Sequence, residues 1–316
     1  MKRRTHRPAR GMTLVELLVA MALSLLIAIA AVSTLITSRQ GFTTVDAASQ
    51  LRDNARFASD LLTRVALQTG FRDVAYAATT REALAGAPAD PEPPVFGFDD
   101  AVPAQGDPAH SVSAGGLNGS DVLVLRYQVP ETYPGSGKAD GSVIDCSGRS
   151  ATDADVPKAR DDVLANVFYV ALHKGEPTLL CVPISPAGAN GSPQPLIQGV
   201  ESFQVLYGTD GVVPGKASTG PADSVVDRLL RADQLTVPAD PAGTFANWRR
   251  VRNIRIGLVL RGPAMPQEDR ASLTLHPLGA AMVDAADHGS TLAAPGDGRP
   301  RQAVTFTVHL RNDQGL

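Results

Sequence analysis

The chain has 316 residues, of which 43% are hydrophobic and 19% are charged, so it has enough apolar material for a folded core. Residues 1–11 carry five basic side chains and no acidic one, which leaves 24 basic and 32 acidic residues, or a charge of −8, for the remainder. Because nucleic-acid binding needs a clustered basic surface, this acidic body argues against a nucleic acid as a direct partner.

An apolar segment follows the basic N-terminus. From Leu17 to Ile36 there are 20 residues without a charge, and as a helix they would span roughly 30 Å, the thickness of the hydrocarbon part of a bilayer. The preceding basic residues place the N-terminus in the cytoplasm and everything after Arg39 across the membrane. A cleaved secretory signal is the competing interpretation, and it fits poorly because the apolar stretch is long and no small-x-small cleavage site follows it.

Glu16 lies at the start of this apolar segment. A carboxylate in a bilayer costs about 2.5–3.5 kcal/mol on insertion scales, and such residues are usually functional or paired. One interpretation leaves the chain intact, with Glu16 reaching the membrane interface. In the other, a cut between Gly11 and Met12 creates an α-amine at Met12, four residues before Glu16 on the same helical face. The amine and the carboxylate could then neutralise each other, within one chain or between neighbours.

Helical periodicity continues beyond the apolar segment and predicts one helix from Met12 to Thr69, with Gly70 as its C-cap. Two helices with a bend near Ser38–Gly41 are the alternative, since glycine weakens a helix locally. The predicted apolar stripe of the second half contains Phe42, Val45, Ala48, Leu51, Ala55, Ala58, Leu62 and Val65.

The remaining sequence predicts strands joined by turns and therefore an α+β fold, in which the long N-terminal helix packs on an antiparallel sheet. Residues 254–260 and 304–310 alternate between apolar and polar side chains, as half-buried strands do. "KGEP" predicts a hairpin turn between strands 166–173 and 178–184. Further strands are predicted at 121–128 and 195–211, a short amphipathic helix at 223–235, and long loops at 85–118 and 130–162.

The polar residues do not form a known catalytic or metal-binding motif, so we expect neither an enzyme nor a cofactor. His309 is predicted to be a solvated residue of a strand, and Trp248 a core anchor. "TDAD" (152–155) and "PGDG" (295–298) lack the spaced oxygen ligands of a calcium loop. Cys146 and Cys181 lack zinc-site spacing. A disulfide between them is favoured if the body is exported, and two unpaired thiols are the alternative.

The stretch "RGMTLVELLVAMALSLL" resembles the class III leader of type IV prepilins, with Met12 where many pilins have Phe. The resemblance implies a leader at residues 1–11 that prepilin peptidase removes after Gly11, N-methylation of Met12, and a filament-docking role for Glu16. It also implies a transmembrane or filament-core segment at 12–37, an amphipathic helical half at 38–70, and a periplasmic or extracellular β-rich head at 71–316.

The head resembles PilW-type minor pilins in "GVESFQVLYGTDG" (199–211), "WRRVRNIRIGLVLRG" (248–262) and "RQAVTFTVHLRN" (301–312). Many relatives have an Asp-rich stretch after the "YG" pair, and here only Asp210 and Gly211 remain of it, which puts a metal-binding loop in doubt. The resemblance implies a pilin-like fold, an inner-membrane location and later a surface pilus.

As partners, the resemblance implies prepilin peptidase, the major pilin, other minor pilins, an inner-membrane assembly platform and membrane lipid. The expected function is pilus assembly as a priming or tip subunit, with twitching motility, adhesion or DNA uptake downstream. A minor pseudopilin of type II secretion, or a membrane-anchored adhesin outside any filament, is the alternative.

Overall fold

The structure is a computed structural model that describes residues 11–73, 92–159, 161–186, 191–264 and 272–312. The basic cluster at residues 2–10 lies outside the described residues, as do residues 85–91 of the predicted loop. The chain divides into two compact units, Met1–Ser49 and Gln50–Leu316. The predicted boundaries at residues 11, 37 and 70 concern processing and membrane position, and they stay predictions.

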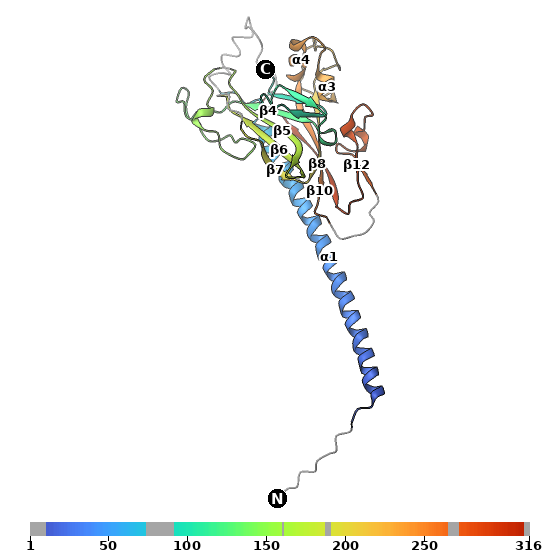
Figure 1. Cartoon of the computed structure of the whole chain (residues 1–316). Coiled ribbons are helices and arrows are strands. Elements are labelled where there is room, and N and C mark those ends of the chain that lie inside the picture. The colour runs from blue at the N-terminus through green and yellow to red at the C-terminus, as the bar shows by residue number, and fades with distance from the viewer. Residues whose placement is uncertain (1–10, 74–91, 160, 187–190, 265–271, 313–316) are drawn as a thin grey trace. The chain divides into compact units, whose positions relative to one another are not determined.

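Helix α1 (Leu14–Gln68) confirms the predicted long N-terminal helix to within two residues at its start and one at its end (Figure 1). Residues 38–41 are helical, so the alternative of two separate helices is not what the structure contains. The helix ends where the sequence predicts, because Gly70 adopts a φ of 77° that favours glycine. The Gly70 amide then donates a hydrogen bond of 2.9 Å to the carbonyl of Arg126.

The described part of the first unit consists mainly of exposed helix. Its large apolar side chains, from Met12 to Ile36, are exposed, and an 18-residue window of α1 has a mean hydropathy of 2.6. By length and composition this helix could cross a membrane. Phe42 and Val45, the first two residues of the predicted stripe, are also exposed. Within the predicted stripe, burial therefore begins further along the helix than expected.

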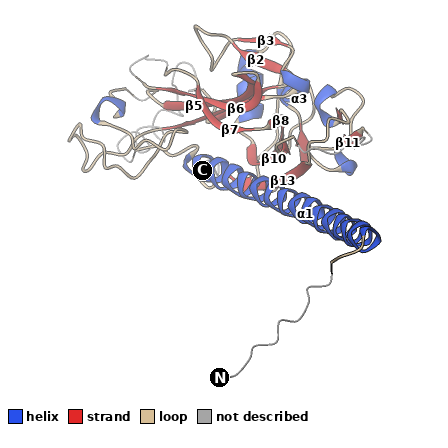
Figure 2. Cartoon of the chain, turned by 60° about the horizontal axis from the view of Figure 1, so that its bottom comes forward, coloured by secondary structure: helices blue, strands red, loops and turns tan. Residues whose placement is uncertain are grey.

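The described part of the second unit contains two larger antiparallel sheets, whose strands are drawn in red in Figure 2. In the described residues the larger sheet has the spatial order β1 (Val95–Phe98), β4 (Val122–Tyr127), β5 (Leu164–His173), β6 (Glu176–Ile184), β7 (Gln194–Gln198). The other has the order β13 (Arg301–His309), β10 (Val251–Arg261), β8 (Val200–Thr209), β9 (Arg228–Leu230).

Smaller elements complete the head. The helices are α3 (Ala232–Leu235) and α4 (Pro241–Trp248). Two ribbons pair β2 (Ala101–Pro103) with β3 (Val112–Ala114) and β11 (Leu273–Leu275) with β12 (Leu292–Ala294). Short 3-10 turns cover Leu117–Gly119, Asp153–Asp155, Ala280–Met282 and His288–Ser290.

One hydrophobic core joins the second-unit part of α1 to both sheets. It contains Phe168 of β5, Phe203 of β8 and Ile256 of β10. Because these side chains and the helix stripe fall in one cluster, the helix end is an integral part of the head. The buried helix residues are Leu51, Ala55, Ala58, Leu62, Val65 and Ala66.

Several predicted strands are confirmed. The β5–β6 hairpin turns at Lys174 and Gly175, whose φ values of 53° and 82° suit a two-residue hairpin turn. In β10 the predicted inward residues 254, 256, 258 and 260 are all fully buried. In β13 the side chains of 304, 306 and 308 are more buried than those of 303, 305 and 307.

Three predictions for the head were wrong. The expected loop at 85–118 contains β1, β2 and β3 in its described part. The expected single strand at 195–211 is two strands in different sheets, separated at Gly199, whose φ is 84°. The expected helix at 223–235 is mostly not helical, because Asp227 donates its amide to the Thr209 carbonyl at 2.9 Å and Leu230 pairs with Tyr207. Only α3 is helical there.

Candidate functional site

The first turn of α1 is closed by a reciprocal pair of hydrogen bonds between Thr13 and Glu16. The Thr13 amide and hydroxyl both donate to Glu16 Oε2, at 2.9 Å and 3.0 Å, and the Glu16 amide donates to Thr13 Oγ1 at 3.3 Å. This is a capping box, which satisfies backbone donors that have no partner within the helix. The Thr-x-x-Glu spacing is a known sequence signal for this cap, and the sequence interpretation of Glu16 missed it.

The predicted cleavage site lies immediately before this cap. Residues 11–13 are not helical, Gly11 is exposed, and 68% of Met12 is exposed. An exposed peptide bond outside a helix is accessible to a protease, whereas a bond inside a helix must first be unwound. The structure therefore brings Gly11, Met12 and Glu16 together at the start of α1. Cleavage and methylation stay predictions.

The apolar part of α1 contains few polar side chains, and these make hydrogen bonds within the helix. The Ser24 hydroxyl donates to the Ala20 carbonyl at 2.7 Å, and Thr34 does the same to Ala30 at 2.8 Å. Ser33 and Thr37 bond to carbonyls three and four residues earlier. Because polar groups in an apolar environment need internal partners, this surface suits lipid or the side of another helix.

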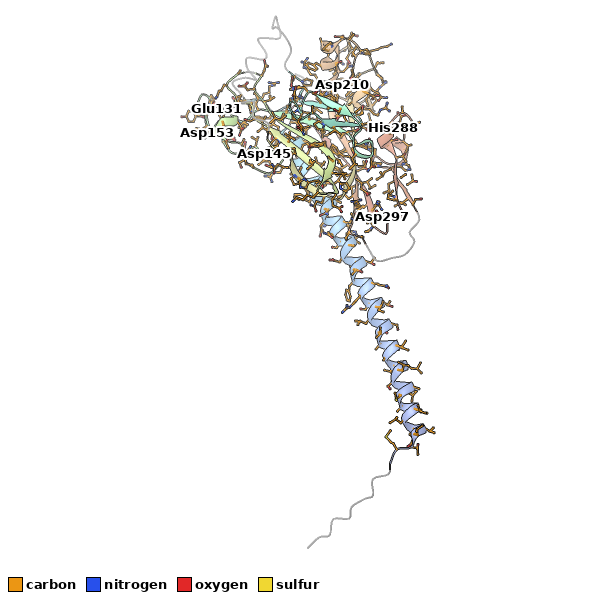
Figure 3. All side chains as sticks on the ribbon, in the orientation of Figure 1. Glu131, Asp145, Asp153, Asp210, His288 and Asp297 are labelled. Carbon is orange, nitrogen blue, oxygen red and sulfur yellow. A yellow bond between two sulfur atoms is a disulfide. The ribbon has the colours of Figure 1, made fainter. Side chains whose placement is uncertain are left out.

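The acidic and histidine residues of the head do not gather into one site. Figure 3 labels Glu131, Asp145 and Asp153 on one side of the head, and Asp210, His288 and Asp297 away from them on the other. Across the described ranges, no three His, Cys, Asp or Glu side chains form a group that could hold a metal ion. Of the two "TDAD" carboxylates, Asp155 instead accepts bonds from the Thr152 amide and hydroxyl of its own turn, and Asp153 accepts from the Ala139 amide.

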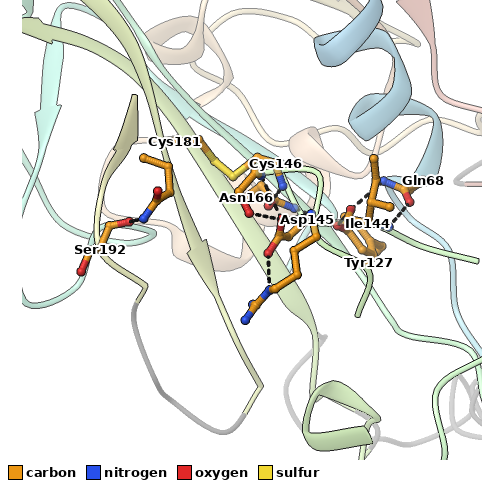
Figure 4. The surroundings of a disulfide bond; sticks show 11 residues. Gln68, Tyr127, Ile144, Asp145, Cys146, Asn166, Cys181 and Ser192 are labelled. Atoms are coloured by element: carbon orange, nitrogen blue, oxygen red, sulfur yellow. Dashed lines mark hydrogen bonds and ion pairs between the residues drawn. A yellow bond between two sulfur atoms is a disulfide. The ribbon is translucent and has the colours of Figure 1, made fainter. Parts of the chain in front are cut away.

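Cys146 and Cys181 form a disulfide that ties the loop after β4 to strand β6 (Figure 4), which confirms the predicted bond. Both half-cystines are fully buried, with their Cα atoms 6.3 Å apart. The loop is held further by Asn166, whose Oδ1 accepts from the Cys146 amide at 2.8 Å. Asn166 Nδ2 in turn donates to the Tyr127 hydroxyl at 3.0 Å.

The same loop is joined to the end of α1. Gln68 donates its side-chain amide to the Ile144 carbonyl at 3.1 Å and accepts from the Ile144 amide at 2.8 Å. The Tyr127 hydroxyl donates to the same Ile144 carbonyl, and burial raises the pKa of Tyr127. The helix end, strand β4 and the disulfide loop are therefore parts of one hydrogen-bonded structure (Figure 4).

Comparisons with known proteins find a match at each end of the chain. Residues 6–32 match the prokaryotic N-terminal methylation motif, and residues 167–312 match the family model of type IV pilus-assembly protein W. The chain is a type IV pilin-like protein with a PilW-type domain. The motif and the apolar helix fit a membrane-anchored pilin, and membership of this kind implies contact with other pilus components.

Among solved structures, a type IV-like pilin from Thermus thermophilus is similar at 14% sequence identity. It has a TM-score of 0.39, and the match covers 83% of this chain and 97% of that one. None of the curated proteins matches this chain.

Within the PilW-type domain, Asp210 has a structural role. Its carboxylate accepts from the Ser224 amide at 2.7 Å and lies 3.5 Å from the Arg252 guanidinium, and all but 2% of Asp210 is buried. A buried carboxylate with these partners holds the chain segments at Ser224 and Arg252 together. Asp210 thus belongs to the fold of this domain.

Trp248 lies in the core, as predicted, at the end of α4. Its ring centroid lies 4.6 Å from that of Tyr207 on β8 and 4.6 Å from that of Phe96 on β1. Since these partners come from both sheets, Trp248 joins the PilW-type domain to the preceding strands. Such a contact between distant segments has no local sequence signal.

A buried network of charges was also missed by sequence reasoning. Glu201 of β8 accepts from Arg301 of β13 at 2.7 Å and from Arg261 of β10 at 3.2 Å. Arg301 also holds Asp297 at 2.7 Å, and this hydrogen bond lowers the pKa of Asp297. The residues of this charge network lie as far as 100 positions apart in the chain, so no spacing pattern in the sequence could reveal it.

Two carboxylates near the start of the larger sheet are unusual because burial opposes their ionisation. Asp121 accepts from the Val205 amide at 2.8 Å and the Asp100 amide at 3.2 Å, and burial raises its pKa well above the usual range. Asp99 accepts from the amides of Ala232 and Asp233, and burial raises its pKa to about 7. Asp121 thereby joins the two sheets through the β8 amide of Val205, and Asp99 holds the start of α3 next to the end of β1.

Proposed function

We propose that this chain is a minor pilin that acts in type IV pilus assembly as a priming or tip subunit. One observation carries the proposal: an N-terminal methylation motif and a PilW-type domain occur in the same chain, at opposite ends. The large head supports a position at the end of a filament, where a bulky subunit is most easily accommodated. Its role is structural rather than enzymatic, and it needs no cofactor.

Processing is the first step of the proposed function. Prepilin peptidase hydrolyses the peptide bond between Gly11 and Met12, and the freed amine of Met12 then receives a methyl group. The exposure of residues 11–13 before the start of α1 supports access to this bond. The subunit remains in the inner membrane with its head in the periplasm until it is assembled.

Docking is the second step, and Glu16 carries it. The capping box engages Glu16 Oε2, so the carboxylate is held at the helix start while its other oxygen remains outside that box. The cationic Met12 amine of a neighbouring subunit can pair with it when the two helices pack in the apolar environment. The apolar side chains of residues 12–36 supply the packing surface.

The proposed partners follow from these steps. They are prepilin peptidase, the major pilin, other minor pilins, the inner-membrane assembly platform and membrane lipid. Pilus formation then supports twitching motility, adhesion or DNA uptake, and the assembled subunit reaches the cell surface.

Substitutions at Glu16 separate docking from capping. Glu16→Gln keeps an acceptor for Thr13, because glutamine also serves in capping boxes, but it has no negative charge to form an ion pair with an amine. We expect Glu16→Gln and Glu16→Ala to be cleaved after Gly11 and to be lost from sheared pili by at least about 10-fold, a coupling typical of close charge pairs. Normal incorporation of Glu16→Gln would show that the cap, and not the charge, is what assembly needs.

Deletion of the chain tests the assignment to a pilus. Electron microscopy of the deletion strain should show few or no surface pili, while a type II secretion assay should remain normal. Normal piliation with defective secretion would instead identify a pseudopilin. Normal piliation together with normal secretion would favour a membrane-anchored adhesin.

A further inference from the structure

The outer edge of the smaller sheet is long and regular. Strand β13 pairs with β10 over nine residues without a register shift, from Arg301 to His309, and no other strand of the described chain lies on its far side. It contains no proline or glycine. Natural proteins usually protect such edges, because unpaired backbone groups can bind another strand.

The backbone of β13 shows which groups face outward. Leu310 donates its amide to the Arg252 carbonyl at 2.9 Å, and the Gly262 amide donates to Pro300 at 2.8 Å. In an antiparallel pair, every second residue of a strand is hydrogen-bonded to its partner strand. Since the register of β13 and β10 is continuous, these two bonds show that the even-numbered residues of β13 are bonded to β10. The amides and carbonyls of Ala303, Thr305 and Thr307 therefore point away from β10, towards the open edge.

The side chains at this edge favour strand pairing. Ala303, Thr305 and Thr307 are exposed and uncharged, and threonine is among the residues most common in strands. The other edges of the two sheets differ, since β1 and β9 have only four and three residues. Strand β7 has five, with a proline and a register shift. Among the described strands β13 thus stands out as an open template.

The charges around the edge argue against a second copy of the chain as the occupant. Antiparallel pairing of two β13 strands about Thr305 would place Arg299 opposite Arg311. Directly opposed like charges destabilise a strand pair. The exposed Arg311 at one end instead favours a carboxylate on the incoming strand.

We propose that β13 is a docking edge for an extended segment of a different pilus subunit, which adds a strand to the smaller sheet. The incoming segment has an uncharged centre rich in β-branched residues and an acidic residue near Arg311. Main-chain hydrogen bonds to Ala303, Thr305 and Thr307 supply the affinity, and the charge sets the direction. This inference rests on the proposed function only in naming a pilus subunit as the source of the partner strand. Docking at β13 involves neither Glu16 nor the N-terminus.

Amide hydrogen exchange in the full-length chain tests this docking edge. The detergent-solubilised free chain is compared with the same chain in sheared pili or in cross-linked membrane assemblies. We expect the amides of 303, 305 and 307 to exchange at least about 100-fold more slowly in the assembly, and those of 304, 306 and 308 to be protected in both states. Equally rapid exchange of the three outward amides in both samples would overturn the proposal. A chain with its Met1 intact would contradict the proposed function instead.

A proline substitution gives a second, independent readout. Thr307→Pro removes an outward donor and leaves the bonds to β10 in place, which edge strands tolerate. Thr307→Val keeps the donor and serves as the control. We expect only Thr307→Pro to reduce co-isolation with the major pilin, by at least about 10-fold, with unchanged melting of the head. Equal co-isolation of both variants would count against a strand at this edge.

A cysteine at the centre of the strand tests whether the partner is a second copy. Thr305→Cys places a thiol at the symmetry point of a β13–β13 pair. We expect no disulfide-linked homodimer under oxidising conditions in the native membrane. Formation of the homodimer would overturn the assignment to a different subunit.

Discussion

The same residue type has opposite surroundings in the two units of the chain. Leu26 and Leu62 both belong to α1, yet Leu26 is 64% exposed whereas Leu62 is fully buried. In the second unit the helix contributes to a closed core with two sheets, while in the first unit the described helix presents its apolar side chains outward. Exposed apolar surface on this scale marks a membrane or protein contact.

This difference separates the requirements of folding from those of assembly. The head has its core, its disulfide and its buried charge network within one chain. The first unit depends on what surrounds it, either lipid or neighbouring helices. Substitutions in the head should therefore change stability, and substitutions in the first unit should change incorporation.

Removal of the disulfide should have the largest effect on the head. The bond closes a loop of 35 residues, for which the chain-entropy relation gives about 4 kcal/mol. We expect the Cys146→Ala/Cys181→Ala double variant to lose that much free energy of unfolding in chemical denaturation. The same measurement on Glu16→Ala is the control and should match the wild type. A double variant as stable as the wild type would show that the hydrogen bonds of Asn166 and Gln68 hold the loop alone.

Truncation of a leucine in each unit compares them directly. Leu62→Ala creates a cavity in the core and should cost about 3 kcal/mol of head stability. Leu26→Ala removes an exposed side chain and should leave the unfolding of the head unchanged. Chemical denaturation of the detergent-solubilised chains measures both effects. Equal losses of unfolding free energy in the two variants would contradict the proposed difference between the two units.

The buried carboxylates predict that the head is more stable in mild acid than at neutral pH. Asp99 and Asp121 have raised pKa values, so the folded state binds more protons than the unfolded state, and for Asp99 this holds between about pH 4 and pH 7. Their contribution is complete below that window and is lost as pH rises through it.

Thermal melting measures this dependence. We expect the melting temperature to fall by about 3–6 °C between pH 5 and pH 8. Asp121→Asn should reduce the slope because it removes one of the buried ionisable groups. An unchanged slope in that variant would assign the dependence to other residues.

Loss of the helix cap should have the smallest effect. Thr13→Ala removes the hydroxyl that bonds Glu16 and should destabilise the first turn by about 1 kcal/mol, whereas Thr13→Ser should retain the cap. Amide exchange at Glu16 and Leu17 in micelles measures this change. Head melting should be the same in both variants. If Thr13→Ala protects these amides as well as Thr13→Ser does, the capping box is not formed in the membrane environment.

The parts of the fold that could be predicted are those with long, regular patterns. The 3.6-residue period gave α1, and alternation gave β10 and β13. The short strands between residues 95 and 114 were not predicted, because segments of three or four residues are too short to show a hydrophobic period. At 223–235 helical spacing was overridden by pairing with β8, as tertiary contacts commonly override local preference.

The candidate site follows the same rule. Gly11, Met12 and Glu16 form a local motif and could be identified from sequence, and so could the Thr13 cap, which was missed. The Glu201–Arg301 pair and the Trp248 contacts join distant segments and needed the structure. The open edge of β13 could not be predicted, since alternation identifies a strand but does not say whether it has a neighbour on each side.

The central claim is that the N-terminal motif is processed into a pilin-type helix start. Mass spectrometry of the N-terminal peptide from the membrane-extracted protein tests it most directly. The account predicts an N-methylated chain that begins at Met12. A membrane-bound chain that begins at Met1, with residues 1–11 intact, would contradict it.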